Sequence, residues 1–153
     1  MGENFLRIAI KQAALSVKKG GFPAGAVIVK NGVIISKGIS VGSKINDPTA
    51  HAETDAIRKA CKKLKTSDLT GATMFESLEC CNMCFSVAYW AGISKIVYAC
   101  KKTPKMVKKF YYEGNVNGDF LNRKNNRRIQ LVFMPEFEKE SLALVDKWEK
   151  INL

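Results

Sequence analysis

Long apolar runs are missing from this chain of 153 residues. None approaches the roughly 18 residues that a membrane-spanning helix needs. The opening segment, residues 1–19, carries charges at Glu3, Arg7 and Lys11, unlike the apolar centre of a secretory signal. We therefore expect a cytoplasmic protein with no membrane partner. Hydrophobic residues at 46% and charged residues at 25% are ordinary for folded chains and argue against disordered, collagen-like and coiled-coil classes.

Histidine and cysteine are also scarce. Histidine is present once, as His51, and the cysteines are Cys61, Cys80, Cys81, Cys84 and Cys100. An odd number of cysteines, three of them closely spaced, does not suit a disulfide framework and is more typical of a metal site in a reducing compartment. We expect Cys61 and Cys100, which lie outside the cluster, to be buried small hydrophobes.

Acidic residues are few, 14 against 25 basic ones, and the formal net charge is +11. The excess is concentrated in residues 95–128, which hold ten basic residues and only two acidic ones. Positive charge attracts phosphate and can indicate a nucleic-acid partner. Only five of the basic residues are arginine, however, and phosphate and base recognition favour the arginine fork. A nucleic-acid partner therefore stays open as the less favoured interpretation.

Apolar periodicity and turn residues predict alternating helices and strands. The expected helices cover residues 3–19, 49–64 and 81–92, with a last amphipathic helix opening at Pro135. The expected strands cover residues 24–30, 33–39, 70–77, 94–100 and 127–133. Asn31-Gly32 favours a hairpin between the first two strands. Residues 40–48 have loop composition, and residues 101–126 lack periodicity, so we expect a loop or a short helix there.

The strand-helix-strand order between residues 70 and 100 predicts parallel neighbouring strands joined by a right-handed crossover, so helices should cover the sheet. The expected fold class is α/β. The orientation of the last two strands relative to each other is left open.

Two short motifs begin helices and carry chemistry: His51-Ala52-Glu53 and Cys81-Asn82-Met83-Cys84. Exposed N–H groups at a helix N-terminus favour thiolates, which bind zinc. One histidine and two cysteines leave the fourth tetrahedral position to water, which is the catalytic arrangement, and such a water ionises near neutral pH. Glu53 is placed to shuttle protons.

Simpler interpretations of the same residues exist. Taken singly, His51 could be an ordinary helix-start residue, and Cys81 and Cys84 could be buried small side chains. The two cysteines could also form a redox pair, but this would leave His51-Ala52-Glu53 unexplained. Their joint presence favours the metal site.

The stretches NDPTAHAETDAIRKAC and SLECCNMCFSVAYWAGISKIVYAC resemble the zinc-dependent cytidine deaminase superfamily, whose signature is H-x-E with P-C-x-x-C. The likeness is greatest to bacterial guanine deaminases, followed by tRNA adenosine deaminases, and it runs from the first helix to about Cys100. It implies a three-layer α/β/α sandwich with a five-stranded mixed sheet, formed by one deaminase domain over residues 1–153. It also implies a homodimer.

The resemblance implies hydrolytic removal of an amino group from a nucleobase, with release of ammonia. One Zn²⁺ per chain would be held by His51, Cys81 and Cys84, and Glu53 would move protons between the zinc-bound water and the ring. A free purine such as guanine is the expected substrate. The alternatives are a tRNA-specific adenosine deaminase, and a catalytically silent binding module stabilised by zinc.

The chain departs from the family pattern at three places, of which the first adds a thiol that could compete as a zinc ligand and the other two concern the substrate pocket. Cys80 replaces the proline of the signature, Ser40 stands where many base deaminases carry asparagine, and neither FYYEG nor EKINL matches the C-terminal segments that close the pocket in guanine deaminases. The expected substrate contacts are Ala24, Gly25, Ala26, Ser40, Trp90 and Glu113. All except Ser40 have a simpler alternative. Residues 24–26 could be an ordinary strand start, Trp90 could be an aromatic residue that only packs, and Glu113 could be a surface residue.

Overall fold

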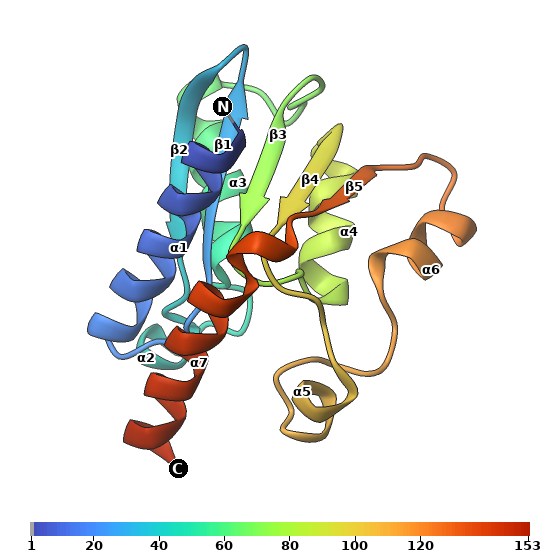
Figure 1. Ribbon diagram of the computed structural model, residues 1–153. Coiled ribbons are helices and arrows are strands. Elements are labelled where there is room, and N and C mark those ends of the chain that lie inside the picture. Colours follow the sequence, from blue (N-terminus) through green and yellow to red (C-terminus); the bar gives the residue numbers. More distant parts are fainter. Residues whose placement is uncertain (1) are drawn as a thin grey trace.

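A five-stranded mixed sheet forms the centre of the computed structural model, which describes residues 2–153 (Figure 1). In spatial order the strands are β2 (Val33–Ile39), β1 (Gly25–Lys30), β3 (Thr73–Glu76), β4 (Lys95–Tyr98) and β5 (Gln130–Phe133). β1 pairs antiparallel with both β2 and β3, whereas β3, β4 and β5 are parallel. The mixed sheet is therefore confirmed, and the orientation of the last two strands, which the sequence left open, is parallel.

Helices cover both faces of this sheet, so the α/β/α arrangement is confirmed (Figure 1). One face carries α1 (Gly2–Lys18) and α7 (Glu138–Asn152), which follows a short 3-10 turn at Pro135–Phe137. The other face carries α3 (Ala52–Leu64) and α4 (Asn82–Trp90). Three further short helices lie in the connections: α2 (Gly42–Ile45), α5 (Pro104–Lys108) and α6 (Gly118–Lys124). No helix within residues 2–153 is both long and apolar enough to cross a membrane.

The alternation of side chains along β1 divides the core into two layers. Val27 and Val29 pack in the cluster that contains Leu6 of α1, whereas Ala26 and Ile28 pack in the cluster that contains Ala56 of α3. Successive strand residues point to opposite faces of a sheet. A strand covered on both faces must be apolar throughout, which explains the unbroken run AVIV.

The connections contain more helix than the sequence indicates. Residues 101–126, where a loop or one short helix is expected, form two short helices. α2 lies in residues 40–48, which are expected to be a loop. Local capping explains α5 and α6, because Thr103 accepts a hydrogen bond from the Met106 N–H and Asn117 accepts one from the Phe120 N–H. Helices this short do not show a periodic pattern of apolar residues, so periodicity in the sequence does not reveal them.

Candidate metal centre and active site

One edge of the sheet gathers the functional motifs. The C-terminal ends of the parallel strands β3 and β4 lie at this edge, and the antiparallel pairings bring the start of β1 and the end of β2 to it as well. The N-termini of α3 and α4 follow connections that leave from there. Ligand sites in open α/β sheets form at the carboxyl ends of strands. The topology thus brings His51 and Cys81, thirty residues apart in sequence, to one place.

His51 is the N-cap of α3, and Thr54 holds its backbone. The N–H of His51 donates to Thr54 Oγ1 at 3.0 Å, and the Thr54 hydroxyl lies within hydrogen-bond distance of the carbonyl oxygens of Thr49 and His51. Thr54 is buried. These contacts limit the movement of the His51 backbone and hence of its imidazole ring.

Cys81 and Cys84 lie on one side of the first turn of α4. Cys81 is the N-cap of this helix, and its Sγ accepts a hydrogen bond from the Cys84 N–H at 3.5 Å. His51 Nδ1 lies 3.5 Å from each sulfur atom. A tetrahedral Zn²⁺ with ordinary bond lengths would separate a nitrogen and a sulfur ligand by about 3.6 Å. All three ligand atoms lie within 4.8 Å of one another, so the donor set and its spacing fit zinc.

The protonation behaviour of the two thiols differs although they are neighbours. The hydrogen bond from the Cys84 thiol, supported by His51, lowers the pKa of Cys81 to about 5. The pKa of Cys84 is raised, because its thiol donates to Cys81 and is buried. The pair therefore already holds one thiolate near neutral pH, and a bound cation would favour the second.

Glu53 follows His51 by two residues and is buried in the same site, 5% exposed. Burial raises the pKa of Glu53 to about 7, and the charge of Cys81 adds to the effect. A carboxyl group with a pKa near neutrality can both accept and donate a proton at physiological pH.

A cavity of about 360 Å³ opens beside these residues. Its wall is formed by Phe22, Ala24, Ser40, His51, Glu53, Leu78, Glu79, Cys81, Lys109, Phe110, Tyr111, Tyr112 and Trp148. Sites for small molecules usually measure roughly 300–1,000 Å³. Two of the metal ligands, His51 and Cys81, and the buried carboxyl group of Glu53 thus share one cavity of the size of a small ligand.

The family model of the cytidine and deoxycytidylate deaminase zinc-binding region matches residues 1–100. The chain belongs to this deaminase family. Guanine deaminase of Bacillus subtilis (strain 168) is 46% identical over 102 residues, which is 66% of this chain and 65% of that protein. A tRNA-specific adenosine deaminase of Aquifex aeolicus (strain VF5) is 41% identical over 97 residues, 63% of this chain and 64% of that protein.

The chain spans slightly less than two thirds of the length of these two curated relatives. The likeness extends further in three dimensions. A structure from a study of A-to-I editing by tRNA:A34 deaminases at the wobble position of transfer RNA superposes with a TM-score of 0.79 at 27% identity, covering 93% of this chain and 99% of that one. Residues 51, 81 and 84 form the zinc-binding triad of the deaminase family.

Of the expected substrate contacts, the structure brings Ala24 and Ser40 to the cavity of this member of the family, but not Gly25 or Ala26. Gly25 instead allows α1 to approach β1, since a Cβ atom there would lie 2.1 Å from the Ala9 carbonyl oxygen. Ala26 is fully buried in the core below α3. The small residues of this strand start therefore serve packing, except for Ala24.

Trp90 lies away from the metal centre, whereas Glu113, which is not part of the cavity wall described above, lines an adjoining hollow together with His51 and Cys81. Trp90 is the last residue of α4, at the opposite end from Cys81, and it is 81% exposed. Glu113 caps α4, because its carboxylate accepts hydrogen bonds from the N–H groups of Met83 at 3.0 Å and Asn82 at 3.3 Å. Although burial opposes the effect, backbone hydrogen bonds hold the pKa of Glu113 below its usual value.

Aromatic residues that no sequence motif indicates lie at the mouth of the cavity. Phe22, Tyr111 and Trp148 pack against one another with ring centroids 5.0–5.8 Å apart. Glu149 of α7 fixes this group by accepting hydrogen bonds from Tyr111 at 2.6 Å and Lys109 at 2.7 Å. These residues come from three distant segments, and no local motif joins them.

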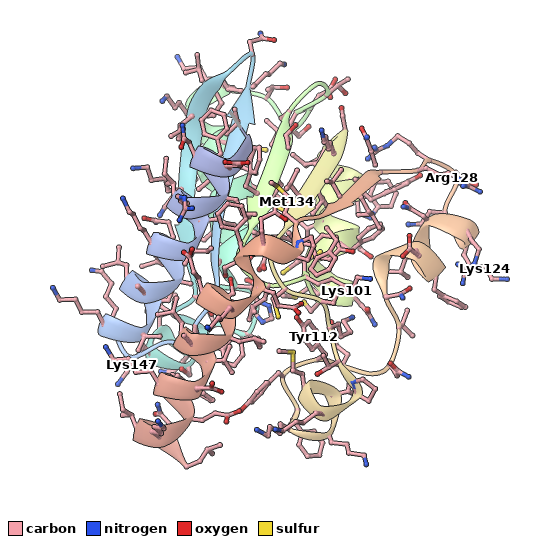
Figure 2. The ribbon with its side chains drawn as sticks, viewed as in Figure 1. Lys101, Tyr112, Lys124, Arg128, Met134 and Lys147 are labelled. Atoms are coloured by element: carbon pink, nitrogen blue, oxygen red, sulfur yellow. The ribbon has the colours of Figure 1, made fainter. Side chains whose placement is uncertain are left out.

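Tyr112 lies between the end of β4, α5 and α7 (Figure 2). Its hydroxyl donates to the carbonyl oxygen of Glu79 at 2.5 Å, and its ring lines the cavity. Tyr112 therefore connects the segment after β4 to the loop that precedes Cys81.

Proposed function

We propose that this member of the deaminase family is a zinc-dependent hydrolase that removes the amino group from a free purine base such as guanine. The observation that carries the proposal is the shared cavity: His51 and Cys81 of the metal centre, the buried Glu53 and a largely aromatic mouth line the same space.

In this proposal the residues of the chain divide the work. When bound, zinc supplies a Lewis acid that activates water for attack on the amino-bearing carbon of the ring. Glu53 would accept the proton that the attacking water gives up and deliver it to a ring nitrogen, and would then carry a second proton, from the new hydroxyl group on the ring carbon, to the departing amine. A pKa of about 7 suits both transfers.

The mouth of the cavity supports a free base as the substrate. Trp148 and Tyr111 present aromatic surface on which a planar base can stack, and contacts to Glu149 hold Tyr111 in place. Helix α7 contributes Trp148 to the wall of the cavity. The 46% identity to a guanine deaminase agrees with this choice.

The test is ammonia release by the zinc-loaded protein from free bases, nucleosides and a tRNA transcript, with Glu53→Ala as the blank. We expect release from a free purine alone. The variant should keep its zinc and lose activity by roughly 10²- to 10⁴-fold, because the ligands remain and the proton carrier is gone. Turnover by Glu53→Ala close to wild type would contradict the role of Glu53. Silence of the wild type on every substrate would favour the binding-module alternative.

A tRNA adenosine deaminase is the second candidate, because several relatives carry that description and the surface after β4 is basic. Figure 2 shows Lys124 and Arg128 at the side of the molecule formed by α6 and the approach to β5, with Lys101 nearer to Tyr112. Ammonia release from the transcript alone would establish this candidate in place of the first.

A further inference from the structure

Glu76 is an acidic residue in the interior of the protein, and the proposed zinc chemistry assigns it no role. It is the last residue of β3 and is completely buried. Its Oε1 accepts a hydrogen bond from the Cys80 N–H at 2.9 Å. Its Oε2 is buried without a hydrogen-bond partner among residues 2–153. Burying a carboxyl group in this way is costly, so a compensating role is expected.

The partner of Glu76 stands directly before a zinc ligand. Cys80 precedes Cys81, the residue at which α4 begins, and it occupies the position of the proline in the deaminase signature. Proline has no N–H group and fixes its own backbone angle. Cysteine at this position brings a flexible backbone and a buried N–H group that needs an acceptor. Glu76 supplies that acceptor.

The Cys80 thiol is not part of the ligand group. It is 6% exposed and lies outside the group of three ligand atoms. What Cys80 contributes to the site is therefore the geometry of its backbone.

We propose that Glu76 is a positioning residue of the metal centre: by holding the Cys80 N–H, it fixes the turn that presents Cys81, in place of the proline ring of the family signature. This inference rests on the proposed function of the same site. Glu76 and Cys80 form a matched pair, so changing either one alone leaves an unsatisfied buried group, whereas changing both removes the donor and the acceptor together.

The test is a double-mutant cycle of Glu76→Val, Cys80→Pro and the combined variant, with zinc affinity measured by competition against a chelator. Glu76→Val should weaken zinc binding by roughly 10- to 100-fold, the usual cost of losing a residue that supports a metal ligand. Cys80→Pro alone should also weaken it, because both carboxylate oxygens then lack partners. The combined variant should recover most of the loss. Equal or additive losses in the combined variant would overturn the proposal.

Two further variants separate positioning from general stability. Glu76→Gln keeps an oxygen acceptor for the Cys80 N–H and should bind zinc nearly as well as the wild type. Leu6→Ala opens a cavity in the core on the opposite face of the sheet, and should lower Tm without weakening zinc binding. If Glu76→Gln lost as much zinc affinity as Glu76→Val, the hydrogen bond to the Cys80 N–H would not be the cause of the loss.

Cobalt substitution gives a readout that needs no substrate. With Co²⁺ in place of zinc, absorption from the thiolate ligands should shift in Glu76→Val and return to the wild-type form in the combined variant. An unchanged spectrum in Glu76→Val would contradict the proposal. These measurements hold even if no substrate is turned over, so failure of the proposed function and failure of this inference are distinguishable.

Discussion

At the scale of single residues, Glu53 and Glu76 are two buried carboxyl groups close enough to influence each other. Burial raises the pKa of Glu76 well above its usual value of 4.5, and the charge of Glu53 adds to this effect. Burial likewise raises the pKa of Glu53, but only to about 7. Glu53 reaches the cavity, whereas Glu76 is sealed in the core. A proton on Glu76 can therefore persist while Glu53 exchanges its own.

The raised pKa of Glu76 predicts how stability depends on pH. The folded state holds this proton more tightly than the unfolded chain, so the contribution to stability is full below the usual pKa of 4.5 and is lost as pH rises through the raised pKa. Glu76→Gln has no such proton. The free energy of unfolding of the wild type, measured relative to Glu76→Gln in denaturant, should therefore fall between acidic and neutral pH. A difference that stays constant with pH would show that Glu76 does not titrate as described.

The assignment of the cysteine ligands gives a second prediction at this scale. Cys81→Ala should lose the metal, because Cys81 Sγ lies 3.5 Å from His51 Nδ1 in the ligand group. Cys80→Ala should retain it, since the N–H group bonded to Glu76 is still present. Zinc content after dialysis against a weak chelator measures both. The opposite order of zinc retention would place the ligands one residue earlier.

At the scale of elements, α7 completes a site whose chemistry lies elsewhere. Trp148 reaches the cavity mouth, where its ring lies 5.1 Å from that of Phe22, and the neighbouring Glu149 binds Lys109 and Tyr111. The metal ligands stand at the starts of α3 and α4. The metal ligands and the aromatic residues at the cavity mouth therefore belong to different elements.

This division predicts different effects for the two tryptophans. Trp148→Ala should raise KM for the free base by about 10-fold with a smaller change in kcat, because it removes stacking surface and leaves the reacting groups in place. Trp90→Ala is the matched control, since Trp90 is 81% exposed and does not line the cavity. Steady-state kinetics of both variants gives the KM and kcat values that test this prediction. A larger effect from Trp90 than from Trp148 would contradict the assigned cavity.

At the scale of the whole molecule, the basic excess after β4 is partly used inside the protein. Arg127 donates to the carbonyl oxygens of Ile93 and Tyr89, Lys109 pairs with Glu149, and Lys102 lies over the ring of Tyr112 at 4.6 Å. Other basic residues of the segment are exposed, namely Lys101, Lys105, Lys108, Arg123, Lys124 and Arg128. Internal contacts therefore explain only part of the charge.

The salt dependence of catalysis tests whether the exposed charges bind a polyanion. For a free base, kcat/KM should change little between about 50 and about 200 mM salt, because a neutral base releases no counterions on binding. A tRNA substrate held by several lysines would instead lose orders of magnitude over the same range. A steep loss with the free base itself would contradict the proposed binding mode.

Short-range patterns account for what could be predicted. His51-Ala52-Glu53 and Cys81-Asn82-Met83-Cys84 carry their own spacing, and each lies at a helix start that local residues establish. The hairpin at Asn31-Gly32 has the same local origin, because these two residues tolerate the φ angles of 51° and 74° that the turn requires. Ala24 and Ser40 reach the cavity as expected, since each adjoins a predicted strand end at the same edge of the sheet.

Residues whose role depends on distant partners could not be assigned in this way. The capping contact of Glu113 exists only because the fold brings it against the start of α4, and Trp90 shares its helix with the cysteines but lies at the opposite end. Glu76 has no distinguishing pattern in β3, and only the turn that returns Cys80 to it gives it a hydrogen bond.

The sequence by itself determined the metal ligands, the position of Glu53 beside them and the alternation of helices and strands, because these depend on residues a few positions apart. Only the tertiary structure decided the parallel pairing of β4 with β5, the aromatic mouth built from Phe22, Tyr111 and Trp148, and the contact between Glu76 and the turn before Cys81. The order of strands and the packing of α7 set these distances, and both result from burial summed over the whole core.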